Sequence, residues 1–204
     1  MKSIIQSFCE QLSEEFDQIP DDRKIALNKI AAYIKYKENE PIDLLFVCTH
    51  NSRRSIFAQI WAKVAAHYYG FSNVETFSAG TVATEFNGNV VYALMHQGFD
   101  MWVEGDTYNS IHHMIFDSKK NAAVCFSKEL DHIINPQESF AAIMTCNDAD
   151  QNCPFVPGCE LRVTLPYVDP KSSDGTDLQT QTYLKTSTVI AREMLYLFSI
   201  ASAK

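Results

Sequence analysis

The fold of this chain is decided by residues 44–55, which read Leu44-Leu45-Phe46-Val47-Cys48-Thr49-His50-Asn51-Ser52-Arg53-Arg54-Ser55. Four consecutive apolar residues predict a short strand that is buried on both faces. The segment 55–69 repeats apolar residues at helical spacing, at Ile56, Ile60, Val64 and Tyr68. This spacing predicts a helix. A loop between such a strand and helix directs backbone N–H groups and the positive helix end toward one spot. The sequence therefore predicts a site for a tetrahedral oxyanion.

The side chains of this loop suit nucleophilic chemistry on such an anion. Cys48 lies at its base, where the same field favours a thiolate, and Arg54 can donate to two anion oxygens at once. Ser55 or Ser52 can donate a hydroxyl to the Cys48 sulfur, and Asn51 tolerates the left-handed backbone that tight anion loops need. A structural cysteine beside a surface arginine is the simpler interpretation of the pair alone. The flanking strand and helix favour the catalytic interpretation.

The pattern Cys48-Thr49-x-Asn51-Ser52-x-Arg54-Ser55 resembles the anion loop of the low-molecular-weight tyrosine phosphatases. It is equally similar to the loop of the thioredoxin-coupled arsenate reductases that share their fold. The resemblance implies that arsenate or phosphate is the bound anion. The residues that would bind it are Thr49, His50, Asn51, Ser52, Arg53, Arg54 and Ser55.

Three positions in or near the loop depart from these families. His50 stands where they usually carry glycine, so a strained or differently shaped backbone is expected there. Arg53 replaces a cysteine or an apolar residue and is expected to lie on the surface. Gln59 stands where potassium-binding arsenate reductases have a glutamate. The chain also lacks, after Asp169-Pro170, the tyrosines that line the phosphotyrosine pocket of the phosphatases, which favours the reductase.

The composition excludes several classes of function. A net charge of −8 argues against a general nucleic-acid or acidic-membrane role. No apolar run approaches the roughly 20 residues of a membrane span. The N-terminal residues lack the charged-then-apolar order of a signal peptide. Six cysteines without such a signal indicate a reducing cytoplasm, where cysteines tend to be reactive, metal-binding or buried.

The order of the predicted elements indicates one α/β domain with appendages. Residues 1–40 predict an N-terminal helical extension, and for 41–204 the resemblance implies a phosphatase-like arsenate reductase domain. Further strands are expected at 74–80, 140–145 and 162–166, and further helices at 90–97 and 183–200. This alternation predicts a three-layer fold around a four-stranded parallel sheet.

The segment 105–138 is interpreted as an insertion that contains a β-hairpin. Two apolar runs, 112–116 and 122–126, flank a polar turn. His112 and His113 together with Cys125 could be considered as metal ligands. Adjacent residues of a strand point to opposite faces, so surface and packing positions are preferred and no metal site is predicted.

Two more cysteines complete the candidate site. Cys146 follows the strand 140–145, and Cys153 comes seven residues later in Cys-Asn-Asp-Ala-Asp-Gln-Asn-Cys-Pro. The carboxyl ends of parallel strands gather the site in α/β sheets, so Cys146 and Asp169 are both expected near the Cys48 loop. Zinc spacing would need a further cysteine or histidine pair. The segment closely resembles the redox segment of the thioredoxin-coupled arsenate reductases.

This resemblance implies a three-cysteine relay that needs no cofactor. Cys48 attacks bound arsenate, and Cys146 then attacks the Cys48 sulfur and releases arsenite. Cys153 moves the disulfide outward to Cys146–Cys153, which thioredoxin reduces. Asp169 matches the family's aspartate before proline, a general acid. Two alternatives stay open: a phosphatase that forms a Cys48 phosphocysteine, and a non-catalytic thiol redox sensor.

Overall fold

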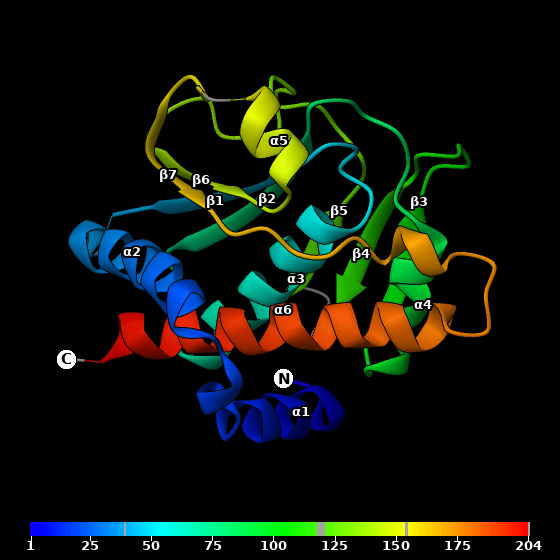
Figure 1. Ribbon diagram of the computed structural model, residues 1–204, viewed down its shortest axis with the longest axis horizontal. Helices are drawn as coiled ribbons and strands as arrows, with labels where there is room; N and C mark the ends of the chain where they lie inside the picture. Colours follow the sequence, from blue (N-terminus) through cyan, green and yellow to red (C-terminus); the bar gives the residue numbers. More distant parts are fainter. Residues whose placement is uncertain (39, 118–120, 154, 204) are drawn as a thin grey trace.

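The computed structural model describes residues 1–38, 40–117, 121–153 and 155–203. Its centre is a parallel sheet in the order β2-β1-β6-β7 (Figure 1). The strands are β1 (Ile42–Cys48), β2 (Val74–Gly80), β6 (Phe140–Met144) and β7 (Cys159–Thr164). The predicted three-layer α/β fold with a four-stranded parallel sheet is confirmed. Because β1 is an interior strand, Cys48 lies at the carboxyl edge between β2 and β6.

Strand β1 is buried on both faces, as its four consecutive apolar residues predict. Leu44 and Phe46 belong to the large core on the helix-covered face. Leu45 and Val47 alternate to the opposite face, where they pack with Met144 and other side chains beneath α5 (Asn147–Asn152). The period of two along the strand divides the apolar run between two cores.

Helices α3 (Arg54–Tyr68) and α6 (Gln179–Ser202) cover one face of the parallel sheet, and α5 lies on the opposite face (Figure 1). α3 is buried nearly all round because β1 and β2 pack on one side of it and α6 on the other. The α4 helix (Gly88–His96) also packs on α6. α3 is therefore fixed rigidly, and so is the loop that precedes it.

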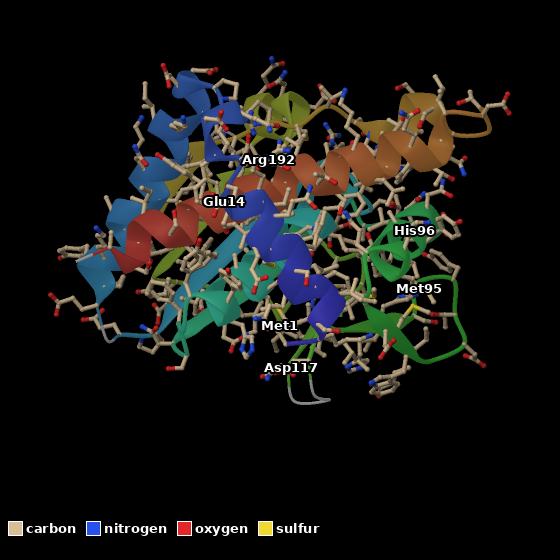
Figure 2. The ribbon with its side chains drawn as sticks, turned by 90° about the horizontal axis from the view of Figure 1, so that it is seen from below. Met1, Glu14, Met95, His96, Asp117 and Arg192 are labelled. Atoms are coloured by element: carbon tan, nitrogen blue, oxygen red, sulfur yellow. The ribbon has the colours of Figure 1, made fainter. Side chains whose placement is uncertain are left out.

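The N-terminal residues form the predicted helices, and these pack on the main core. They are α1 (Ser3–Ser13), the short 3-10 helix η1 (Phe16–Gln18) and α2 (Asp21–Lys37). α1 lies across α6 on the side away from the parallel sheet (Figures 1 and 2). The amino group of Met1 pairs with Asp117 at 3.1 Å, and Arg192 of α6 pairs with Glu15. Ile5, Leu12 and Leu27 are fully buried in the main core.

The insertion forms a second, antiparallel sheet in the order β3-β4-β5. β4 (Ile111–Ile115) and β5 (Ala122–Cys125) make the predicted hairpin, with Ile115 opposite Ala122. Residues 118–120 of the predicted turn lie outside the described residues. β3 (Asp100–Glu104) was not predicted, because its Met101-Trp102-Val103 run is half exposed and follows closely on α4. The second sheet therefore begins before residue 105.

Several predicted boundaries are corrected. The fourth strand is β7 at Cys159–Thr164, earlier than the predicted 162–166. Its first residues alternate polar and apolar, so the apolar run begins late, and Pro166 has no N–H for a ladder. α4 and α6 begin earlier than predicted, α4 because the Asn87 side chain caps it by accepting from the Asn89 N–H at 3.0 Å. Within the described residues no helix has the length and apolarity needed to cross a membrane.

Candidate functional site

The loop between β1 and α3 is held by the side chain of Asn51, which is fully buried. Its Nδ2 donates to Ser55 Oγ at 2.9 Å, and its Oδ1 accepts from the Lys128 backbone N–H at 2.9 Å. Asn51 adopts the left-handed backbone, with φ of 43°. His50 has no positive φ, so the expectation of strain at His50 is wrong: the special conformation falls one residue later, on an asparagine, which tolerates it.

Cys48 lies at the base of this loop and is 3% exposed. Its Sγ is 3.1 Å from Ser55 Oγ. Since Ser55 Oγ already accepts from Asn51, its own hydrogen is free to be donated to the sulfur. Of the two serines predicted to donate to Cys48, the structure shows Ser55. A hydroxyl donor at this place stabilises negative charge on sulfur.

The chain that follows β2 supports the other side of the loop. The Thr81 and Val82 N–H groups donate to the carbonyls of Cys48 (3.2 Å) and Thr49 (2.9 Å). A Cβ on Gly80 would lie 2.8 Å from the Asn51 nitrogen and 2.9 Å from the Thr49 oxygen. Gly80 is therefore required for the close approach of β2 to the loop. The Ser78-Ala79-Gly80 turn was visible in the sequence, but its contact with the loop was not.

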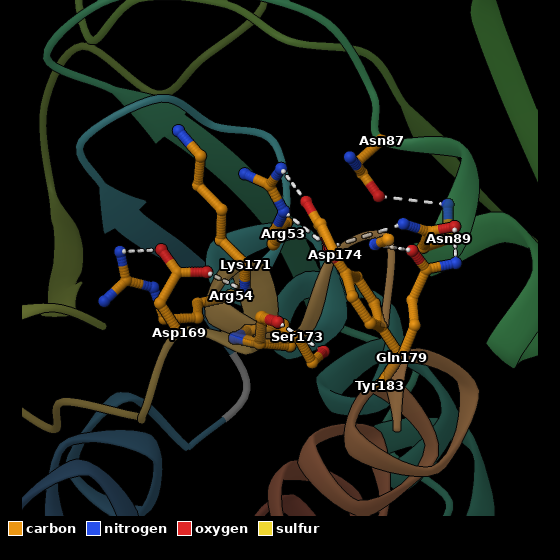
Figure 3. A network of polar contacts seen from close by, with 12 residues as sticks. Arg53, Arg54, Asn87, Asn89, Asp169, Lys171, Ser173, Asp174, Gln179 and Tyr183 are labelled. Atoms are coloured by element: carbon orange, nitrogen blue, oxygen red, sulfur yellow. Dashed lines mark hydrogen bonds and ion pairs between the residues drawn. The ribbon is translucent and has the colours of Figure 1, made fainter. Parts of the chain in front are cut away.

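Arg54 and Asp169 meet at the same crevice, as predicted from the ends of β1 and β7 (Figure 3). Arg54 Nη2 is 2.8 Å from Asp169 Oδ2, and Nη1 donates to the Tyr167 carbonyl at 3.3 Å. Its buried Nε–H has no hydrogen-bond partner among the described residues. That donor is available for an oxygen of a bound anion. The other Asp169 oxygen accepts from the Lys171 N–H at 3.0 Å and so caps η2 (Pro170–Ser173).

Arg53 does not lie on the surface, so this expectation is wrong. Its side chain is 13% exposed and pairs with Asp174 at 3.2 Å. Its Nε donates to the Tyr183 hydroxyl at 2.8 Å, and that hydroxyl donates to Asp174 at 2.7 Å (Figure 3). Burial and the Asp174 contact raise the pKa of Tyr183. The Arg53 guanidinium thus ties the loop to α6, and the predicted role of Arg53 in binding the anion stays a prediction.

The predicted loop residues His50 and Ser52 differ in exposure, but the carbonyl groups of both accept hydrogen bonds from other segments. The His50 imidazole is exposed, while the His50 carbonyl accepts from Ser127 (2.9 Å) and Thr84 (3.0 Å). Ser52 is buried, and its carbonyl accepts from the Asn87 N–H at 3.2 Å. These backbone contacts come from the end of the insertion and the start of α4. Sequence patterns gave no signal for them.

Cys146 lies beside the loop and is fully buried. Its Sγ is 3.4 Å from the Thr49 hydroxyl and accepts from the Ala149 N–H at 3.3 Å, which caps α5. Cys153 ends the same helix and is partly exposed. Cys146 therefore lies next to the Cys48 loop, as predicted. The α5 helix lies between Cys146 and Cys153 in the sequence.

Other candidate groups are occupied by structural contacts. The Gln59 amide accepts from Ser78 at 2.6 Å and donates to two backbone carbonyls, which ties β2 to β5. The His113 ring stacks on Trp102, with centroids 3.9 Å apart. Burial raises the pKa of the Cys9 and Cys125 thiols to about 12. These thiols pack as small apolar groups.

Fold and loop together are those of a phosphatase-like protein, in which the carboxyl edge of a parallel sheet carries a loop with a cysteine and an arginine. No protein-family model matches the chain. An arsenate reductase of Bacillus licheniformis is 29% identical over 137 residues, which span 66% of this chain and 78% of the relative. An arsenate reductase of Bacillus subtilis is 30% identical over 134 residues, with the same two shares. The chain therefore belongs to the arsenate reductase family of enzymes.

The fold agrees with this membership. The solution structure of a low-molecular-weight protein tyrosine phosphatase from Bacillus subtilis superposes with a TM-score of 0.53 at 19% identity. The superposition covers 78% of this chain and 96% of that chain. This chain thus has the fold of that phosphatase, and the resemblance inferred from residues 48–55 is confirmed.

Gly80→Ala tests the close approach of β2 to the loop. The added Cβ must displace the Asn51 or Thr49 backbone, so we expect phosphate to bind at least about tenfold more weakly, or about 1.4 kcal/mol. Isothermal titration with phosphate measures this. Gly88→Ala is the matched control, since a Cβ there meets nothing within 4 Å. Equal phosphate affinity of the folded Gly80→Ala protein and the wild type would contradict the steric argument.

Proposed function

We propose that this protein reduces arsenate to arsenite through Cys48, Cys146 and Cys153, with thioredoxin as the final reductant. The observation that carries the proposal is the position of Cys146, which is buried against Thr49 at the edge of the Cys48 loop. A phosphatase has no use for a second thiol there. The name of the curated relatives, arsenate reductase, supports the same activity.

The first step forms a bond between sulfur and arsenic. The loop N–H groups and Arg54 hold the arsenate oxygens, and the Cys48 thiolate attacks arsenic(V). One oxygen leaves as water after protonation. We infer that Asp169 supplies that proton as general acid, because its carboxylate contacts Arg54 at 2.8 Å and Arg54 is the proposed ligand of the anion.

The second step transfers two electrons. The Cys146 thiolate attacks the Cys48 sulfur, the S–As bond breaks, and its electron pair leaves with arsenic, which becomes arsenic(III). Arsenite departs and a Cys48–Cys146 disulfide remains. Cys153 then attacks Cys146, which frees the Cys48 thiolate and leaves Cys146–Cys153. An external dithiol of the thioredoxin class reduces this disulfide by exchange. Such a cycle suits a reducing compartment, the cytoplasm.

Hydrolysis of phosphate monoesters is a second candidate. The proposed nucleophile Cys48, anion donor Arg54 and general acid Asp169 are the groups that this reaction needs, and it uses neither Cys146 nor Cys153. Arg54 pairs with Asp169 at 2.8 Å, and Ser55 Oγ lies 3.1 Å from the Cys48 sulfur. A phosphocysteine formed on Cys48 would be hydrolysed by water. The exposed Lys171 follows Asp169-Pro170 in place of an aromatic residue, which favours a small anion over an aryl ester as the main substrate.

Cys48→Ser and Cys146→Ser separate the two activities. Cys48→Ser removes both, because a serine hydroxyl has no comparable anion at neutral pH. Cys146→Ser removes multiple-turnover arsenate reduction but spares hydrolysis of p-nitrophenyl phosphate. The assays are NADPH oxidation coupled through thioredoxin and its reductase, and nitrophenol release. Cys9→Ser, at a buried cysteine on α1 of the N-terminal extension, is the control. Equal loss of both activities in folded Cys146→Ser would refute the relay.

Asp169→Asn tests the general acid. We expect kcat/KM for phenyl phosphate, a poor leaving group, to fall roughly 10²-fold or more, the usual range for a lost acid. For p-nitrophenyl phosphate the loss is smaller, because that leaving group needs little protonation. A small, uniform decrease across a series of phenols would show that Asp169 does not protonate the leaving oxygen.

Formation of the Cys146–Cys153 disulfide requires α5 to unwind. If the segment were helical from Cys146 to Cys153, seven rises of about 1.5 Å would place the two Cα atoms ~10 Å apart, whereas a disulfide tolerates less than about 7 Å. We expect amides 147–153 to lose protection from hydrogen exchange on oxidation, with the disulfide verified by mass spectrometry. Equal protection in both redox forms would mean that the segment does not switch.

Arg162 provides a sharper version of this experiment. Its Nη2 donates to the carbonyls of Asp150 (2.9 Å) and Cys153 (3.1 Å) and pairs with the Asp150 carboxylate at 2.7 Å. Arg162→Gln should therefore raise exchange of amides 147–153 already in the reduced protein. Lys63→Gln, which removes an ion pair to Glu75 on β2, should leave those amides unchanged.

A further inference from the structure

Arg23, on α2 of the N-terminal extension, contacts the segment that leads to Asp169. Its guanidinium forms a two-pronged ion pair with Glu193 of α6, through Nε and through Nη2 at 2.7 Å. The third nitrogen, Nη1, donates to the Pro166 carbonyl at 2.9 Å. The same group lies over the Tyr167 ring, 4.7 Å from its centroid. All three guanidinium nitrogens are therefore engaged.

Glu193 and Tyr167 complete a buried polar cluster with Arg23. Glu193 is 2% exposed and Tyr167 is 8% exposed. The Tyr167 hydroxyl donates to Glu193 Oε2 at 2.7 Å. Burial, and then the neighbouring carboxylate, raise the pKa of Tyr167 well above its ordinary value, so the phenol stays a donor. A buried carboxylate is strongly destabilising without its cation, which makes Arg23 indispensable to this cluster.

The cluster adjoins the candidate site directly. The Tyr167 carbonyl accepts from Arg54 Nη1 at 3.3 Å, and Asp169 follows two residues later. The Tyr167 N–H donates to the Thr145 carbonyl at 3.0 Å, at the residue before Cys146. Val168, between Tyr167 and Asp169, is 85% exposed and gives the segment little support. Pro166 and Tyr167 are thus the anchor from which Asp169 projects.

We propose that Arg23 is a positioning residue that holds Asp169 in place through Pro166, Tyr167 and Glu193. The N-terminal extension is then part of the working site and not an appendage. The inference rests on the proposed role of Asp169 as general acid. It means that residues before β1 help to position Asp169, which the α/β domain would otherwise do without them.

The extension also offers a matched control. Arg192 of α6 pairs with Glu15, which follows the end of α1. This ion pair also joins the extension to α6, but it has no contact with Pro166, Tyr167 or Asp169 in the described structure. If the two ion pairs only attach the extension to α6, removing either pair should have the same effect. If Arg23 also holds the Asp169 segment, only the loss of the Arg23 pair should release that segment.

The test uses the full chain with the double substitution Arg23→Met/Glu193→Gln. The glutamine oxygen still accepts from Tyr167, and no unpaired charge is buried. We expect amides 168–171 to exchange faster, since local protection follows local anchoring. Single-turnover arsenite release should slow by roughly 10-fold to 10²-fold, the cost of a misplaced catalytic group. Glu15→Gln/Arg192→Met should leave both measurements unchanged.

Asp169→Asn makes the assignment specific. If Arg23 acts through Asp169, adding Arg23→Met/Glu193→Gln to Asp169→Asn should lower the rate little further. The proposal would be overturned if the rate fell by the full factor again in this combined variant. It would also be overturned if Glu15→Gln/Arg192→Met had the same effects, or if exchange of amides 168–171 did not change. If Asp169→Asn alone leaves the rate unchanged, the acid role fails. In that case, faster exchange of amides 168–171 in Arg23→Met/Glu193→Gln, but not in the control pair, would still show that Arg23 anchors this segment.

Discussion

The hydrogen bonds of the buried Asn51 side chain fix the shape of the oxyanion loop, and the rest of the site depends on that shape. The residues between β1 and α3 lie outside the ladders of strand and helix, so their polar groups need partners from elsewhere. Asn51 joins the Lys128 N–H to Ser55 and, through Ser55, to Cys48. Gly80 allows β2 to approach the same loop closely. Cys48, the proposed nucleophile, is thus held by contacts from the insertion, β2 and α3 together.

The candidate site collects segments that are distant in the chain at one edge of the sheet. β1 supplies Cys48, β6 leads to Cys146, and the chain after β7 supplies Asp169. Polar clusters on the helical side hold these ends. Arg53, Asp174 and Tyr183 join the loop to α6, while Arg23 and Glu193 join α2 to the Asp169 segment. Such clusters contribute little net stability where charges are buried, but they fix the relative positions of reacting groups, which the proposed chemistry requires.

The proposed redox segment, residues 146–153, has the opposite requirement, because the proposed disulfide can form only if this segment changes shape. α5 has only six residues, and of these only Ala149 is buried. Its polar sequence forms helices weakly. Arg162 and Thr164 on β7 hold it through Asp150, with the threonine hydroxyl 2.6 Å from the carboxylate. A short helix held by a few side chains can open at low cost, whereas a longer helix with an apolar face could not. The rigid loop and the weak helix meet at Cys146.

The sequence by itself determined the features that rest on local patterns. The doubly buried strand, the helix after it, the hairpin and the cysteine-and-arginine spacing all follow from residues close together in the chain. The tertiary structure decided where each polar side chain is directed. Arg53 turns to Asp174, 121 positions away, and Arg23 to Glu193, 170 positions away. It also decided that β3 forms, since half-exposed residues become a strand there by pairing with β4. Local periodicity records which residues are apolar and at what spacing. It carries no information on which distant donor meets which acceptor, because that choice is made only when the packed core brings the segments together.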